Sequence, residues 1–429
     1  MSINLFTKYN AAIISYTLLL LLLLAFSPPL GFFVTLIFGV TLSCDFKGYD
    51  NIDKNALLGV NFVFSVLFML IYILSLPSFK YYSDDFASYY NNYLDVSKFG
   101  LLHGFLQFGF YEPLLPIVNF FISLIIDAPY PYLLKVIHGF LNIVLFFICV
   151  ISIIKSMRQS DKSMFLLLMC MWIFYKLPQT LHLMRQGYAC YFIILAIISG
   201  SVRSRFILLA VATLFHISSP LIYLFVKRYF WDLKSIKRSL FWSLLILILI
   251  GIFVSEIRNL SHLMPVFVYE KLFYIIANLD SDGKITRTLS ETINALIYFI
   301  PALFISVFSK SVVRNEVFAK VIVASVFLWA LSAVPGLGLR VMMPVFAVLI
   351  GYIYFLLLVE QKYIIRVLSL IFVVCFLNLN WIFNSDLFYY RFPMASITPF
   401  YYVDSLFESQ DYIYRENLPE TLTIENPYR

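Results

Sequence analysis

Continuous apolar runs constrain the fold of this chain more than any other feature of its sequence. The segments TLLLLLLLAF (17–26) and SLLILILIGIFV (243–254) contain no charged residue, and similar runs recur along the chain. A transmembrane β-strand would alternate apolar and polar residues over segments of about ten, whereas these runs are unbroken. Because the bilayer core requires every backbone polar group to be bonded internally, helices are the expected spanning elements. The runs therefore predict α-helices that cross a membrane.

The composition agrees with this prediction. The 429 residues are 62% hydrophobic and 13% charged, whereas soluble domains are about half apolar and about a quarter charged. Such a composition excludes a soluble enzyme, a nucleic-acid-binding module, a disordered chain and a secreted disulfide scaffold. The five cysteines lie in or beside apolar runs without a CxxC pair or a Cys/His cluster, so we expect no metal site, no disulfide framework and no cofactor. The sequence predicts an all-α polytopic integral membrane protein with about 10–13 membrane helices.

Two arrangements of the spans fit the positions of lysine and arginine. The positive-inside rule favours a cytoplasmic N-terminus, with residues 101–126 as a broken membrane-surface segment and residues 206–226 as a hairpin on the cytoplasmic side. In the alternative, each of these two segments crosses once, and the chain between them is inverted. Both arrangements place the same three stretches outside the cytoplasm, namely residues 77–112, 255–290 and 384–429. We therefore predict one transmembrane domain over residues 1–383, with two outer loops, and an extracytoplasmic tail over residues 384–429.

The first outer loop combines acidic and aromatic residues. If the segment YYSDDFASYYNNYLDVSKFG (81–100) is helical, Asp85, Tyr89 and Tyr93 share one face. A carboxylate beside phenol rings suits sugar binding, because rings stack on apolar sugar faces and acceptors take hydroxyl protons. An aromatic belt at the membrane interface would have the same composition. Both interpretations remain open from the residues alone.

Two charged residues stand where apolar segments begin. Glu112 lies between Tyr111 and Pro113, and desolvation there is expected to raise its pKa, as suits a general base. It is equally suited to be the structural partner of an arginine. Arg185 stands at the start of a short apolar helix, where an arginine can simply extend to the membrane surface. Its planar guanidinium is also suited to binding two phosphate oxygens at once.

Further candidates come from later in the chain. His216 interrupts the run LLAVATLFHISSPLIYLF (208–225), and an ionisable group at membrane depth is a candidate functional residue by default. A histidine that only bonds a neighbouring carbonyl is the alternative. Arg340, in VPGLGLRVMMPVF, and Arg287, at the end of the second outer loop, add positive charge on the outer side. The positive-inside rule disfavours cations there, so an anionic ligand is expected to compensate.

The order of these motifs resembles the EpsG/Wzy family of O-antigen, capsule and exopolysaccharide polymerases. The resemblance covers roughly residues 80 to 345. It rests on five motifs that occur in this order along the chain: Asp85-x-x-x-Tyr89, Glu112-Pro113, Arg185-Gln186 followed by Ala189, Phe215-His216-x-Ser218, and Arg340. One difference is Leu114, where the family often has a glycine after Glu-Pro. The resemblance implies a GT-C-like helical bundle in the bacterial inner membrane, with its site facing the periplasm.

The resemblance also implies a reaction and a set of roles. The growing glycan on undecaprenyl diphosphate is transferred to the next lipid-linked repeat unit, as in lipopolysaccharide O-antigen synthesis. Asp85, Glu112 and His216 are the implied catalytic residues, and Arg185, Arg340, Tyr89 and Arg287 are the implied substrate-binding residues. Asp85 or His216 would take the acceptor proton, while Glu112 would be a second candidate base or an orienting partner. The implied partners are the lipid-linked oligosaccharide, the bilayer and a chain-length regulator protein, with no nucleic acid.

Two other functions remain open from the sequence. A lipid-linked oligosaccharide flippase would also need many helices and cations for a diphosphate, but it would place charges along a path between two pseudo-symmetric halves. No such internal repeat is visible in the sequence. An O-antigen ligase would share both the donor and the compartment, and the residues do not separate it from a polymerase.

Overall fold

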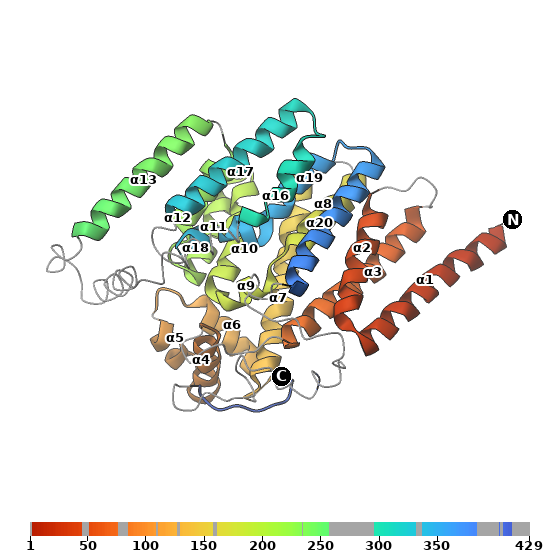
Figure 1. The fold of residues 1–429 in the computed structure, drawn as a ribbon. Coiled ribbons are helices and arrows are strands. Elements are labelled where there is room, and N and C mark those ends of the chain that lie inside the picture. The colour runs from red at the N-terminus through yellow and green to blue at the C-terminus, as the bar shows by residue number, and fades with distance from the viewer. Residues whose placement is uncertain are drawn as a thin grey trace. The chain divides into compact units, whose positions relative to one another are not determined.

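In the structure of this chain, a computed structural model, the regular elements of the described part are all helices (Figure 1). The described residues are 2–44, 51–75, 85–108, 110–126, 129–157, 161–233, 235–256, 296–331, 337–383, 403 and 406–413. The all-α prediction is confirmed for these residues. The chain forms two compact units, of which unit 1 comprises Met1–Ser219 with Gln361–Arg429 and unit 2 comprises Pro220–Glu360.

One helix of the described part is long and apolar enough to span a bilayer by length and composition. It is α7 (Pro131–Met157), with 27 residues and a mean hydropathy of 2.6 over its most apolar window. The described part also contains shorter apolar helical stretches of 10–17 residues, among them Leu114–Ser123 and Met184–Ile198. The predicted number of spans and the GT-C-like arrangement stay predictions.

Unit 1 contains the helices that carry most of the candidate residues. Its elements in chain order are α1 (Ser2–Phe26), α2 (Pro28–Ser43), α3 (Asn51–Ser75), α4 (Asp85–Phe99), α5 (Leu101–Phe108), α6 (Leu114–Ser123), α7, α8 (Asp161–Phe174), α9 (Leu177–His182), α10 (Met184–Ile198), α11 (Val202–Phe215) and α20 (Tyr363–Phe383). Helix α7 packs against α3, α9 and α10, and α10 packs along α11. Helix α7 is therefore central to this unit.

Aromatic side chains form the core between α7 and α8. Phe146 lies 4.3 Å from Tyr175 and 5.6 Å from Trp172 by ring centroids. The indole of Trp172 donates a hydrogen bond of 2.7 Å to Ser65 Oγ on α3. A buried indole N–H needs a hydrogen-bond partner. This bond supplies that partner and also fixes the orientation of the buried ring.

Helices α4, α5 and α6 pack against one another (Figure 1). The first outer loop contains the helix α4, so the condition for placing Asp85, Tyr89 and Tyr93 on one face is met, and Tyr89 and Tyr93 are both buried on it. Gly100 ends α4 with φ of 87°, a conformation that glycine adopts without steric penalty. The predicted break near Pro113 is also present, since α5 ends at Phe108 and α6 begins at Leu114. The first part of the predicted loop, up to residue 84, lies outside the described residues.

Unit 2 begins within α12 (Ser219–Val226). It continues with the π-helical segment η1 (Lys227–Trp231), α13 (Ile236–Glu256), α16 (Ile300–Ser306), α17 (Ser311–Leu331), α18 (Leu337–Val341), the π-helical segment η3 (Pro344–Leu349) and α19 (Ile350–Leu358). The Tyr354 hydroxyl joins α19 to the start of α16 by donating to Tyr298 O at 2.6 Å and accepting from the Ala302 N–H at 3.1 Å. Most of the predicted second outer loop, from residue 257 onward, lies outside the described residues.

Candidate functional site

Three residues that the sequence singled out meet in unit 1. Glu112 lies in the turn between α5 and α6, Arg185 in the first turn of α10, and His216 directly after the end of α11. The Glu112 side chain is 4% exposed, whereas those of Arg185 and His216 are 29% and 23% exposed. The carboxylate is therefore buried beneath two cationic or ionisable groups that remain accessible.

Glu112 accepts three hydrogen bonds in this cluster. Its Oε2 accepts from Arg185 Nη1, and its Oε1 accepts from the Ile217 N–H at 2.8 Å and contacts His216 Nδ1 at 3.0 Å. An ionised carboxylate can only accept, so the contact assigns the hydrogen of a neutral His216 ring to Nδ1. The Nε2 of His216 then carries the lone pair, and it makes no hydrogen bond to any described residue.

The chain around His216 is shaped to present these groups. His216 leaves the helix with φ of −154° and ψ of 116°, so α11 ends at Phe215. The Ser219 hydroxyl closes the turn through contacts of 2.8 Å to Ala212 O and 2.5 Å to His216 O. Because the helix stops here, the Ile217 N–H has no helical acceptor and bonds Glu112 instead.

The environment of Glu112 reverses the expected direction of its pKa. Burial by itself would raise the pKa of this carboxyl. The hydrogen bonds from His216 and Ile217 and the positive charge of Arg185 more than compensate, and they hold the pKa below its ordinary value. The expectation of a raised pKa was wrong because it considered desolvation without the partners that the fold supplies. An ionised carboxylate with three donors suits an orienting role better than that of a base.

Arg185 also faces α4. Its guanidinium carbon lies 6.0 Å from the centroid of the Tyr89 ring, and Asp85 is close enough to influence both residues electrostatically. Burial raises the pKa of the Tyr89 phenol, Asp85 raises it further, and Arg185 opposes them. Tyr89 therefore stays a neutral phenol and can both donate and accept hydrogen bonds.

A close helix contact sets the position of Arg185. Gly187, two residues later in α10, lies so near α9 that a Cβ there would be 2.3 Å from the carbonyl oxygen of Thr180. Only glycine permits this approach between two backbones. The start of α10, and with it Arg185, is held against α9 at a fixed distance.

The structure brings five of the seven predicted residues into one region of unit 1. Asp85, Tyr89, Glu112, Arg185 and His216 interact with one another as described. Arg340 is an exposed residue of α18 in unit 2, and Arg287 lies outside the described residues. The roles assigned to all seven residues stay predictions.

Sequence reasoning overlooked a group of buried polar residues beneath this cluster. They are Asn92 on α4, Asn119 on α6, His138 on α7 and Tyr188 on α10, and all four are at most 2% exposed. His138 lies within an apolar run, as His216 does. The same criterion, an ionisable group at membrane depth, would have identified it.

The comparisons with known proteins point in one direction. The sequence profile of the EpsG family matches residues 60–394, a range that includes every candidate residue named above. No curated protein and no solved structure matches the chain.

Proposed function

The chain belongs to the EpsG family, and on that premise we propose that it is a membrane glycosyltransferase that polymerises a surface polysaccharide. Membership of this family points to a polymerase-type role in polysaccharide synthesis and to the membrane as its location. The proposed donor is a glycan on undecaprenyl diphosphate, and the proposed acceptor is the next lipid-linked repeat unit at the periplasmic face. The observation that carries the proposal is the contact of Glu112 with both Arg185 and His216.

Arg185 is the proposed ligand of the diphosphate. Its side chain is partly exposed while its charge is fixed by a buried carboxylate, so the guanidinium is oriented before any substrate arrives. A guanidinium has five N–H donors in one plane, a geometry that suits two phosphate oxygens at once. Donors fixed in advance at a developing negative charge are the strongest single contribution to catalysis in many enzymes.

His216 is the proposed general base. With its Nδ1–H held by Glu112, the Nε2 lone pair accepts the proton of the acceptor hydroxyl as that oxygen bonds to the anomeric carbon. The bond from the anomeric carbon to the phosphate oxygen breaks, and undecaprenyl diphosphate leaves with the electron pair. The orienting carboxylate stabilises the imidazolium that forms, which is the general logic of a carboxylate–histidine pair.

The remaining predicted residues have supporting roles in this proposal. Asp85 and Tyr89 are placed to bind sugar hydroxyls beside Arg185, and Arg340 and Arg287 are proposed to add positive charge for the diphosphate. A GT-C-like bundle in the inner membrane and a chain-length regulator as partner belong to the same proposal and rest on the family resemblance.

Substitution of Arg185 tests the proposal directly. Arg185→Ala should leave cells with single-repeat, unpolymerised surface glycan, measured as the ladder of chain lengths on a gel. The matched control is Arg203→Ala, which removes an exposed arginine of α11 and should leave the ladder unchanged. Both variants must be present in the membrane at the level of the unmodified protein. Long chains of normal length in the Arg185→Ala strain would refute the assignment.

Deletion of the chain separates the proposed activity from the two alternatives. A polymerase deletion leaves one repeat unit attached to the acceptor lipid. A ligase deletion leaves the acceptor lipid without any repeat, and a flippase deletion traps lipid-linked repeats inside the cell. Only the first phenotype supports the proposal.

A further inference from the structure

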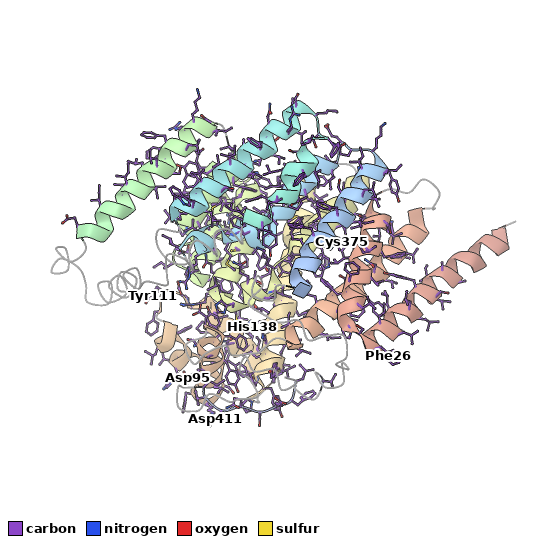
Figure 2. The ribbon with its side chains drawn as sticks, in the orientation of Figure 1. Phe26, Asp95, Tyr111, His138, Cys375 and Asp411 are labelled. Carbon is purple, nitrogen blue, oxygen red and sulfur yellow. The ribbon has the colours of Figure 1, made fainter. Side chains whose placement is uncertain are left out.

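A chain of buried hydrogen bonds runs beneath the Glu112–Arg185–His216 cluster and crosses five helices of unit 1. The hydroxyl of Tyr188 lies 2.8 Å from His138 Nδ1, and His138 Nε2 lies 3.0 Å from Asn119 Oδ1. Asn119 Nδ2 donates to Asn92 Oδ1 at 2.9 Å, and Asn92 Nδ2 donates to the Gly104 carbonyl at 2.9 Å. His138, at the centre of this chain, is fully buried, and Figure 2 shows it in the interior.

The bond from Asn92 to the Gly104 carbonyl determines which atom donates and which accepts in every other bond of the chain. A backbone carbonyl can only accept, so Asn92 must turn its amide nitrogen to Gly104 and its oxygen to Asn119. Asn119 must then direct its nitrogen at Asn92 and its oxygen at His138. His138 Nε2 must donate, which leaves Nδ1 as the acceptor of the Tyr188 hydroxyl. For a neutral imidazole, which full burial favours, these directions place the proton on Nε2 and not on Nδ1.

The glycine at the end of the chain is also required by packing. A Cβ on Gly104 would lie 2.3 Å from Val96 Cγ2 on α4, so α5 approaches α4 this closely only because the residue has no side chain. That approach brings the Gly104 carbonyl within reach of Asn92. The carbonyl that sets the direction of the chain is thus held by the α4–α5 contact.

The elements that present the site residues also supply the members of this chain. Helix α10 carries Arg185 in its first turn and Tyr188 three residues later, so both lie on neighbouring positions of one face. The Tyr188 ring stacks on Phe215, with centroids 5.0 Å apart and planes at 12°. Phe215 directly precedes His216. A displacement of Tyr188 would therefore move both Arg185 and the polypeptide backbone at Phe215, directly before His216.

The same relation holds on the other side of the cluster. Helix α6 starts two residues after Glu112 and carries Asn119, while α4 carries Tyr89 and, three residues later, Asn92. His138 comes from α7, which supplies no residue to the cluster, and it joins the α6 side to the α10 side. It is the central link between the carboxylate and its arginine.

We propose that His138 is a positioning residue for the proposed reaction, which holds Glu112, Arg185 and His216 in register through this directed hydrogen-bond chain. The inference rests on the proposed function of the cluster. An apolar core of the same volume would pack these helices without the desolvation of four polar side chains. A fully bonded polar chain, in contrast, is satisfied in only one arrangement of the helices.

Two substitutions of His138 separate positioning from packing. His138→Leu removes both hydrogen bonds, and polymerisation in membranes should fall about tenfold to hundredfold, as expected when reacting groups shift by about 1 Å. His138→Gln should retain most of the activity, because its amide nitrogen can donate to Asn119 and its oxygen can accept from Tyr188. The matched control is Tyr191→Phe, which removes the equally buried bond of 2.6 Å between Tyr191 and Tyr175. Tyr191 is on α10 but is not a member of the hydrogen-bond chain, so this variant should stay active.

A spectroscopic measurement on the unmodified protein tests the inference without relying on activity, and a variant serves only to assign the signal. Solid-state NMR of 15N-histidine-labelled protein in bilayers should show a signal of a neutral histidine protonated at Nε2 that is absent from His138→Gln and is thereby assigned to His138. A His138 signal that is charged, or protonated at Nδ1, would overturn the inference. So would a Gln variant as inactive as the Leu variant when both are present in the membrane, or a fully active Leu variant. Failure of the proposed function would differ from these outcomes, because Arg185→Ala would then leave long chains intact.

Discussion

Asn91 and Ile413, which lie 322 residues apart, form two reciprocal hydrogen bonds. Asn91 Nδ2 donates to the Ile413 carbonyl, and the Ile413 N–H donates to Asn91 Oδ1, both at 2.9 Å. The Asn91 side-chain amide thus donates one hydrogen bond to Ile413 and accepts one from it, the pattern that a peptide group of an adjacent β-strand would make. The same stretch of tail bonds Pro129 O through the Gln410 N–H at 2.8 Å. Part of the predicted extracytoplasmic tail is therefore fixed on α4.

Removal of this pair should release the tail. Asn91→Ala deletes two buried hydrogen bonds, which we expect to weaken the local docking by about 1–3 kcal/mol. Hydrogen exchange measured by mass spectrometry should show faster exchange over residues 408–413. Asn91→Asp keeps the acceptor but loses the donor, so its effect should be intermediate. Asn55→Ala, at an exposed position of α3, is the control, and equal exchange in the control and in Asn91→Ala would contradict the prediction.

The stability contributed by Glu112 should depend on pH in a defined direction. Its pKa is held below the ordinary value of 4.5, so its contribution is present above that value and is lost as the pH falls through the folded-state pKa. Glu112→Gln removes the charge but keeps the shape, and should destabilise the protein by about 3 kcal/mol at neutral pH, since it leaves Arg185 without its buried carboxylate partner. Thermal unfolding of purified protein in detergent is the measurement.

The pH dependence of this difference is the decisive part. Unmodified and Glu112→Gln protein should converge in stability as the pH falls below the lowered folded-state pKa of Glu112, because Glu112 is then protonated as well. A difference that stays constant or widens on acidification would show that the carboxylate is not stabilised by its partners.

The close contact of α9 with α10 should not tolerate a methyl group. Gly187→Ala places a Cβ 2.3 Å from the Thr180 carbonyl oxygen, so the start of α10 must shift together with Arg185. We expect loss of polymerised glycan and a lower unfolding temperature. Gly59→Ala, in α3, meets no atom within 4 Å and should be neutral or slightly stabilising, because alanine is the better helix former. Equal effects of the two substitutions would refute this account.

Lys320 should be essential for the stability of unit 2. Its side chain is 4% exposed, and its Nζ donates to the carbonyls of Phe230 at 2.6 Å and Trp231 at 3.1 Å. These carbonyls belong to the last residues of η1. Lys320→Met leaves both acceptors unbonded, which we expect to cost about 2–3 kcal/mol in thermal unfolding. Lys310→Met removes a lysine that is 74% exposed and should change stability little; the prediction fails if the two variants unfold alike.

Local sequence pattern predicted several features of the site correctly. The spacing of Asp85, Tyr89 and Tyr93 would place them on one face of a helix, and α4 is a helix over these residues. The His-Ile-Ser-Ser-Pro segment predicted an interruption, and α11 ends directly before His216. These features follow from residues within one or two turns of each other, so a single sequence contains the information for them.

The sequence pattern did not predict which side chains and backbone groups bond each site residue. The pKa of Glu112 was expected to rise, because its burial is visible in the sequence whereas the Ile217 N–H and the Arg185 guanidinium are not. The position of His138 in an apolar run is visible in the sequence, but its bonds to Asn119 and Tyr188, which reach it from two other helices, are not.

By itself, the sequence determined that this chain is helical and suited to a membrane. The solvation free energy of long apolar runs depends on their composition and hardly on which residues they contact. It also determined which ionisable residues interrupt those runs. Only the tertiary structure decided that Glu112 is bonded by Arg185, His216 and a backbone N–H, and in which direction the hydrogen bonds of His138 run. Hydrogen-bond direction and charge pairing depend on distances of a few ångströms between residues far apart in the chain, and folding alone sets those distances.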